Sequence, residues 1–156
     1  MIELIYAGPE NRDLLWNIHQ KYLYEMTAYY SDEMDAAGNY QYRYFNAYFS
    51  EPERKAFLIY HNNSLTGFAM INPYSYLGET PDFVMAEFTI FPMYRGKHVA
   101  SEAAGMMIDT YRGQWEIKYH EKNLPAKRLW NKVAGIYCPR RVKFNDSETV
   151  LCFSTR

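Results

Sequence analysis

The residues with the clearest potential for chemistry lie in one short segment near the middle of the chain. Residues 87–100 read Glu-Phe-Thr-Ile-Phe-Pro-Met-Tyr-Arg-Gly-Lys-His-Val-Ala, an order that predicts a buried strand, a basic turn and a helix. The first N–H groups of a helix have no acceptor within it, and the helix dipole places partial positive charge there. The turn at Arg95, Gly96 and Lys97 therefore has the features of a phosphate-binding site, although most turns of this kind only reverse the chain.

The surrounding elements alternate between strand and helix periods. Strand patterns occupy residues 1–7, 56–61, 65–72, 83–91, 114–120, 136–144 and 148–153. Helical patterns follow Asn11 and Asn123 as caps, and another begins at Val99. Residues 83–91 are apolar on both faces, as expected of a central strand. The pattern predicts a mixed-sheet α/β fold, with one domain over residues 1–156.

Charge and composition disfavour several classes of function. Seventeen basic and eighteen acidic residues give a net charge of −1, which lacks the positive excess that nonspecific nucleic-acid binding requires. No His/Cys cluster has metal-ligand spacing, so we expect no metal. Residues 56–78 carry no Asp, Glu, Lys or Arg, but asparagines, a glycine and a proline interrupt them, so they favour a hairpin over a membrane span.

The cysteine content and the N-terminal residues indicate a compartment. Residues 1–6 lack a basic leader followed by an apolar stretch. We therefore expect a cytoplasmic location, with Cys138 and Cys152 both reduced.

Tyrosine is abundant, with 16 residues, many of them between positions 22 and 48. Tyrosine combines apolar area with a hydroxyl, so such crowding is typical of a partly wet cleft or of a subunit contact, which leaves a homodimer open. The alternative is a core that uses tyrosine at its margins.

Residues 95–100 resemble motif A of the GNAT superfamily, the acyl-CoA-dependent N-acetyltransferases. The family pattern is Arg or Gln, any, any, Gly, any, Gly or Ala, and here Arg95 and Ala100 occupy its first and last positions. His98 stands where the family most often has glycine. We expect a helical φ,ψ at His98, because negative φ needs no glycine and still presents the N–H toward a pyrophosphate. A solvated histidine at a helix start is the alternative.

A second stretch resembles the family's motif B, which has an Asn, an Ala three residues later and commonly a Tyr four further. Asn123, Ala126 and Trp130 hold these positions. In the family this helix lines the pantetheine channel and the Asn bonds the cofactor arm. The Tyr often protonates the leaving thiolate, which an indole cannot do. A water or another tyrosine would have to replace it.

The resemblance implies a fold and a cofactor. The fold would be a sheet of about six or seven strands flanked by helices, with strands four and five splayed apart, and the cofactor would be acetyl-CoA. The cofactor-binding candidates are the main chain of the central strand, the turn and helix start, and the second helix: Phe88, Ile90, Arg95, Gly96, Lys97, His98, Val99, Ala100, Asn123 and Trp130.

Glu87 is the leading candidate for a catalytic base. A lysine-like amine has a pKa near 10.4, so only about one molecule in a few thousand is neutral at pH 7 and able to attack a thioester. Strict alternation places Glu87 on the same face as Phe83 and Met85, so we expect burial to raise its pKa. The alternative is a buried carboxylate tied to an arginine or to backbone donors. His120 is the second candidate base, and a surface histidine is its alternative.

The leading hypothesis is an N-acetyltransferase that acts on a small-molecule or peptide primary amine by direct attack. The acceptor would meet the acidic and aromatic surface of residues 29–42, with Tyr29, Tyr30 and Tyr40 as contacts, and would then be cationic. The alternative is a non-catalytic acyl-CoA-binding sensor or scaffold, suggested by Trp130 and His98. A toxin that acts on charged tRNA is a third hypothesis, which the neutral charge balance disfavours.

Overall fold

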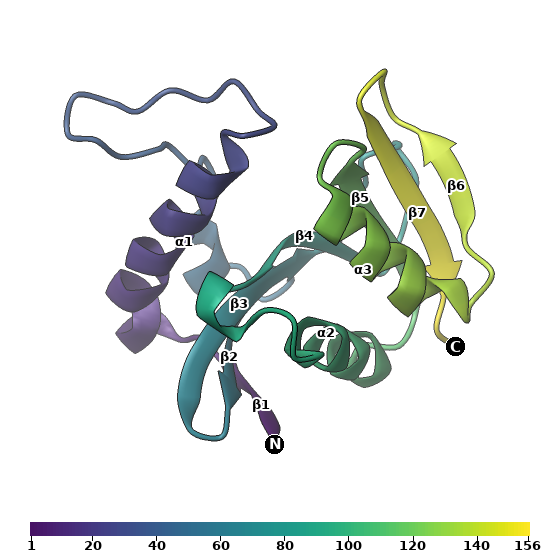
Figure 1. Cartoon of the computed structure of the whole chain (residues 1–156), viewed down its shortest axis with the longest axis horizontal. Coiled ribbons are helices and arrows are strands. Elements are labelled where there is room, and N and C mark those ends of the chain that lie inside the picture. Colours follow the sequence, from purple (N-terminus) through teal and green to yellow (C-terminus); the bar gives the residue numbers. More distant parts are fainter.

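The strand patterns of the sequence form one mixed sheet of seven strands in the computed structural model, which describes residues 1–156 (Figure 1). The strand order is β1-β2-β3-β4-β5-β7-β6. Only β4 and β5 pair in parallel, and all other neighbours are antiparallel. The strands are β1 (Ile2–Tyr6), β2 (Lys55–His61), β3 (Ser64–Asn72), β4 (Phe83–Ile90), β5 (Gln114–His120), β6 (Arg140–Lys143) and β7 (Glu148–Ser154). The predicted mixed α/β class is confirmed.

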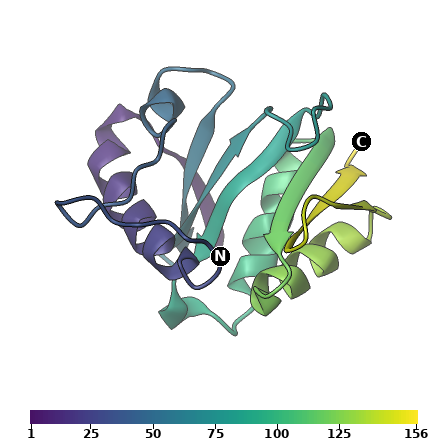
Figure 2. The same ribbon diagram turned by 90° about the horizontal axis from the view of Figure 1, so that it is seen from above.

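Helices cover both faces of this sheet (Figure 2). One face carries α1 (Arg12–Met26), whose Leu15 and Ile18 pack with Phe68 and Met70 of β3. The other face carries α2 (Val99–Thr110) and α3 (Leu124–Gly135), which pack in a second, larger apolar cluster that includes Ile71. Short 3-10 turns occupy Pro9–Asn11, Asn46–Phe49 and Pro92–Tyr94.

The two central strands separate along their length. β4 and β5 pair only over three positions, from Phe83 opposite Trp115 to Met85 opposite Ile117. Beyond Met85 the strands diverge, and Figure 1 shows the opening between them above α2 and α3. The splayed centre that the sequence resemblance implied is therefore present, and it leaves one edge of β4 without a partner strand.

A bulge in β4 overturns the strict alternation predicted for this strand. Met70 of β3 lies opposite Glu87, and the next residue, Ile71, lies opposite Met85, so Ala86 is an extra residue. Met85 therefore faces the apolar cluster under α2 and α3, while Glu87 faces α1. The prediction that Glu87 shares a face with Met85 is wrong, because an inserted residue reverses the side-chain order.

Helix caps follow the sequence in one case and not in the other. The Asn123 side-chain oxygen accepts the Ala126 N–H at 3.3 Å and caps α3, as predicted. Asn11 precedes α1, but its side chain makes no capping bond there and accepts the Gly8 N–H at 3.2 Å instead. The start of α1 is therefore stabilised by its packing and not by a side-chain cap.

The uncharged segment of residues 56–78 forms β2, β3 and the loop that follows them. Asn62 and Asn63 have positive φ values of 50° and 67° and make the tight turn of the predicted hairpin. No helix anywhere in residues 1–156 combines the length and the apolar character needed to cross a bilayer. Cys138 and Cys152 are unpaired.

Candidate active site

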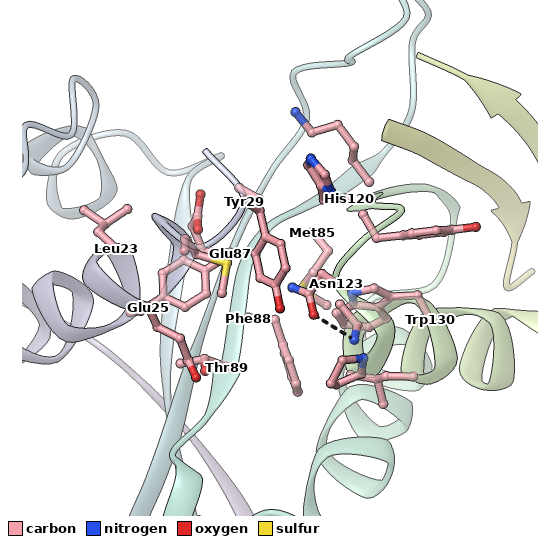
Figure 3. Close-up of a pocket in the computed structure, with 18 of the residues that line it drawn as sticks. Leu23, Glu25, Tyr29, Met85, Glu87, Phe88, Thr89, His120, Asn123 and Trp130 are labelled. Carbon is pink, nitrogen blue, oxygen red and sulfur yellow. Dashed lines mark hydrogen bonds between the residues drawn. The ribbon is translucent and has the colours of Figure 1, made fainter. Parts of the chain in front are cut away.

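A cleft of about 1290 Å³ opens where β4 and β5 diverge. α1 and the loop after it form one wall, and α2 and α3 form the other (Figure 3). The exposed side chain of Lys97 does not line this cleft. Every other residue singled out from the sequence does: Glu87, Phe88, Ile90, Arg95, Gly96, His98, Val99, Ala100, His120, Asn123, Trp130, Tyr29, Tyr30 and Tyr40.

The turn before α2 presents a run of free main-chain donors. None of the six N–H groups from Gly96 to Ser101 donates to an acceptor within the chain, and the first bond of the helix runs from the Glu102 N–H to the His98 carbonyl at 3.1 Å. Gly96 has a φ of +78°. Such a run of main-chain donors at a helix start makes an anion-binding concavity.

His98 adopts a left-handed conformation, with φ +63° and ψ +8°. The prediction of a helical conformation there is wrong. The turn needs left-handed backbone at this position, which is the physical reason why glycine suits it. The His98 side chain is exposed, so it adopts this strained backbone without being buried.

Arg95 is directed away from these free donors. Its two terminal nitrogens donate to the Glu25 carboxylate at 2.7 Å each, and its Nε donates to the Ile90 carbonyl at 2.7 Å. The bonds to Glu25 raise the pKa of Arg95 above its ordinary value. The charge of Arg95 is therefore already paired with Glu25, and Arg95 does not add a free cation to the basic turn.

Two cations that sequence reasoning missed line the α3 wall of the cleft. Arg128 and Lys132 lie one turn apart on α3, are exposed, and form no ion pair. The sequence contained a signal for this pair. Arg128 and Lys132 are four residues apart, so they lie on the same side of a helix whose cap, Asn123, was already a predicted cofactor-binding residue.

The open edge of β4 adds main-chain donors in the middle of the cleft. Phe91 donates its N–H to the Thr66 carbonyl at 2.7 Å, toward β3. Successive residues of a strand direct their N–H groups to opposite edges. The N–H groups of Phe88 and Ile90 therefore face the gap between β4 and β5, where a carbonyl oxygen could accept them.

Glu87 faces the cleft from the α1 side and is half-buried (Figure 3). The Tyr42 hydroxyl donates to its carboxylate at 3.4 Å. Burial raises the pKa of Glu87 to about 7, although the Tyr22 and Tyr42 hydroxyls and the charge of Lys118 act in the opposite direction. The expected direction and its expected cause, burial, both hold. Sequence reasoning did not connect Glu87 with the tyrosines of α1 and its following loop, whose hydroxyls oppose the rise.

His120 ends β5 and is buried, with 8% of its surface exposed. Its ring lies 5.6 Å from the Tyr29 ring and 5.5 Å from the Tyr30 ring. Its Nδ1 accepts the Lys122 N–H at 3.1 Å, so a neutral ring keeps its proton on Nε2. The alternative of a surface histidine is wrong.

The three tyrosines predicted to meet the acceptor differ in their surroundings. The Tyr30 hydroxyl donates to Glu148 at 2.8 Å. Tyr40 is buried, and its main chain exchanges two hydrogen bonds with the Gln20 side chain at 2.6 and 2.8 Å. Tyr29 extends its ring into the opening between the strands (Figure 3).

Comparison with known families identifies the family of this chain. The profile described as "Acetyltransferase (GNAT) family" matches residues 14–136, which is more than half of the chain. The chain belongs to the GNAT family. Comparison with curated proteins finds no match. No group of three or more His, Cys, Asp or Glu side chains in residues 1–156 is arranged to hold a metal ion.

Solved GNAT structures share the fold over almost the full length. An acetyltransferase from Thermus thermophilus is 17% identical, with a TM-score of 0.69, and the match covers 99% of this chain and 97% of the other. An N-acetyltransferase from Campylobacter jejuni, solved with acetyl coenzyme A, is 10% identical, with a TM-score of 0.63 and full coverage of both chains. An N-acetyltransferase from Thermoplasma acidophilum, solved with coenzyme A, is 12% identical, with a TM-score of 0.64 and 99% coverage of both.

The motif B positions of this GNAT chain lie on the α3 wall of the cleft. Trp130 is buried, and its ring packs edge-to-face on the Phe88 ring with centroids 5.1 Å apart. Asn123 uses its oxygen to cap the helix, while its side-chain N–H₂ has no acceptor in the chain. Trp130 therefore shapes the cleft, and Asn123 retains two donors for a ligand.

Proposed function

We propose that the protein is an acetyl-CoA-dependent N-acetyltransferase that transfers the acetyl group directly to a primary amine. One relationship supports this proposal above all others: a single cleft joins five residues with unpaired main-chain N–H groups, Gly96 and His98 to Ser101, to a half-buried carboxylate with a pKa of about 7. Acetyl-CoA, when bound, supplies an acetyl thioester.

The residues of the chain fit such a cofactor at three places. The free N–H groups from Gly96 to Ser101 suit a diphosphate, because amides at a helix start favour anions. The side-chain N–H₂ of Asn123 is available to an amide of the cofactor arm. The N–H groups of Phe88 and Ile90 would donate to the carbonyl oxygen as it gains negative charge.

Glu87 is the proposed base. A carboxyl with a pKa of about 7 is about half ionised at neutral pH, where it accepts a proton from an ammonium group and leaves a nucleophilic amine. Holding the amine against the carbonyl supplies the alignment that direct transfer requires. His120 is the second proposed base, since its ring lines the same cleft; to accept a proton, its Nδ1 would have to release the Lys122 N–H.

The proton for the leaving sulfur would come from a group other than Trp130, because indole N–H is not acidic enough. Of the three acceptor-side tyrosines predicted from the sequence, Tyr30 is already a donor to Glu148, while the Tyr29 hydroxyl forms no hydrogen bond within the chain. We therefore propose Tyr29 or a water as the donor.

The acceptor side is consistent with a small-molecule or peptide amine. An aminoglycoside acetyltransferase solved with coenzyme A shares the fold, at 11% identity and a TM-score of 0.70. We also propose a cytoplasmic location, in which two unpaired cysteines stay reduced. A homodimer through the tyrosine-rich surface remains part of the proposal.

A non-catalytic acyl-CoA sensor is the second candidate function. The observation that favours it is the buried Trp130 at the position where many GNAT enzymes have a proton-donating tyrosine. Calorimetry that shows coenzyme A binding without acyl transfer to any amine would support the sensor.

An assay of free thiol release distinguishes the two functions. Acetyl-CoA is offered with polyamines, aminoglycosides, amino acids and peptides, and the acetylated product is identified by mass spectrometry. The proposal expects amine-dependent thiol release that Glu87→Gln reduces. Thiol release at background level with every acceptor would contradict it.

A further inference from the structure

We infer that the acceptor is a cationic amine with no acidic group near its reacting nitrogen, such as a polyamine or an amino sugar, and that amino acids are excluded. This inference rests on the proposed function, since it defines the acceptor of the same cleft. It follows from two observations: the cations on the Glu87 side of the cleft are paired with carboxylates, and Glu87 itself has no cation partner.

The cations on the Glu87 side of the cleft each have a carboxylate partner. Arg54 is buried and donates to Glu51 at 2.6 Å. Lys118 lies 3.0 Å from the Glu148 carboxylate. Because both positive charges are already paired, this side of the cleft has no free cation for a carboxylate or phosphate of the acceptor.

These cations are also enclosed by aromatic rings. The Arg54 guanidinium lies 4.3 Å from the centre of the Tyr44 ring and 4.4 Å from that of the Tyr74 ring. The Lys118 ammonium lies 4.6 Å from the centre of the Tyr76 ring. Such cation–π contacts hold both side chains in place, so neither is free to turn toward a ligand.

Arg95, which follows the end of β4, is likewise paired with the Glu25 carboxylate of α1. The unpaired Arg128 and Lys132 belong to α3, on the face of the sheet opposite to Glu87. Unpaired positive charge is therefore available on the α3 wall, whereas the cations on the side of the proposed base are paired.

Glu87 is a carboxylate of the cleft that forms no ion pair with a cation of the chain. No Lys, Arg or His nitrogen lies within 4.0 Å of it, and the Tyr42 hydroxyl is 3.4 Å away. An ammonium group carries three donors and no acceptor, so it matches a site made of one carboxylate and neighbouring hydroxyl oxygens. A half-buried carboxylate without a cation is only partly solvated, and a cationic ligand would relieve that cost.

The residues at the entrance of the cleft also favour a cationic ligand. Asp32 and Glu33 line it and form no ion pair. Unpaired carboxylates at the entrance attract cations and repel anions before they reach Glu87. An acceptor with a second ammonium group would gain from both positions, whereas an α-carboxylate would be repelled by both.

The test compares two ligands that differ only in one carboxylate: 1,5-diaminopentane and lysine. Calorimetric titration of the full chain without acetyl-CoA, at pH 8 so that Glu87 is ionised, should show at least about tenfold tighter binding of the diamine, a difference of about 1.4 kcal/mol. Pentylamine should bind and 1-pentanol should not. Lysine binding as tightly as the diamine, or no binding of the diamine at about 10 mM, would overturn the inference.

Two variants locate the effect. Glu87→Gln, which keeps the side-chain shape, should reduce the preference for the diamine severalfold, since only Asp32 and Glu33 would then repel a carboxylate. Tyr42→Phe should weaken the binding of the diamine and of pentylamine. Asp13→Asn is the matched control, because Asp13 is an exposed acid of α1 that does not line the cleft. Circular dichroism confirms that each variant is folded. An undiminished preference in folded Glu87→Gln would contradict the assignment.

The design separates this inference from the proposed function. Tight diamine binding without any acetyl transfer would support the cation-binding site and contradict the proposed enzymatic activity. Acetyl transfer that favours lysine over the diamine would support the enzymatic activity and contradict the inference about the acceptor.

Discussion

The Arg95 guanidinium and the Glu25 carboxylate are joined by two hydrogen bonds of 2.7 Å each, from the turn before α2 to the last turns of α1. The Arg95 Nε also holds the Ile90 carbonyl at the end of β4. This pair therefore connects the proposed phosphate-binding turn to the helix that carries Tyr22 and precedes Tyr29, both of which line the cleft. We propose that Arg95 positions the acceptor wall.

Separate substitution of the two partners tests that role. Arg95→Gln and Glu25→Gln should each raise the KM for the amine severalfold, with coenzyme A affinity changed by less than about threefold, because a half-exposed bidentate pair contributes about 1 kcal/mol. The double variant should be no worse than either single variant. Loss of coenzyme A binding in Arg95→Gln alone would instead make Arg95 a phosphate ligand.

The pH dependence of catalysis should report Glu87. A base works only when deprotonated, so kcat/KM should rise with pH and level off above about pH 7, the pKa of Glu87. Glu87→Gln should lower the rate by about 10²–10⁴ and remove that inflection, which leaves only the rise due to the amine itself. An unchanged inflection would remove Glu87 from the mechanism.

Tyr42→Phe tests the same carboxyl through its neighbour. The Tyr42 hydroxyl lowers the pKa of Glu87 by donating to it. Its removal should move the inflection of the pH profile to higher pH, with a smaller rate loss than that of Glu87→Gln. An inflection that moves to lower pH would contradict the hydrogen bond.

The left-handed His98 should accept glycine without loss of stability. Glycine adopts positive φ freely, so His98→Gly should leave the free energy of unfolding unchanged or raise it by up to about 1 kcal/mol. His98→Val should lower it by about 1–2 kcal/mol, since a branched side chain strains that backbone. Lys97→Gly is the control and should destabilise, because the φ of Lys97 is not positive. Urea denaturation measures all three, and a destabilised His98→Gly would contradict the strain.

His19 should make stability depend on acid pH. It is fully buried, neither ring nitrogen has a partner, and burial lowers its pKa from 6.5 to about 4. Between pH 6.5 and 4, His19 is therefore protonated in the unfolded chain but not in the folded chain. The free energy of unfolding consequently falls as the pH drops through this range, by about 3 kcal/mol in total. His19→Phe should reduce that slope in urea unfolding at pH 7 and pH 4.5. An identical slope would show that His19 is not responsible.

The sequence contained enough information for the cofactor side of the cleft. Hydrophobic periods located all seven strands, and the Asn123 cap fixed the start of α3, because both depend on local sequence. The turn from Arg95 to Val99 was found through glycine and charge. Its backbone conformation at His98 was missed, since a histidine rarely adopts positive φ.

The acceptor side was less predictable because it depends on contacts between distant segments. The extra residue Ala86 in β4 cannot be recognised from alternation alone, yet it decides which face Glu87 occupies. The tyrosines near Glu87 come from α1 and from an irregular loop, and the ion pair of Lys118 with Glu148 joins β5 to β7. Only the folded sheet brings these groups together.

The most direct test of the account is a titration of isotopically labelled protein with coenzyme A, followed through its amide resonances. The six free N–H groups from Gly96 to Ser101 should show the largest shifts, while the amide of Gly78, in the loop between β3 and β4, should stay unchanged. Saturating coenzyme that leaves the amides of residues 96–101 unmoved would contradict the diphosphate site and the transferase with it.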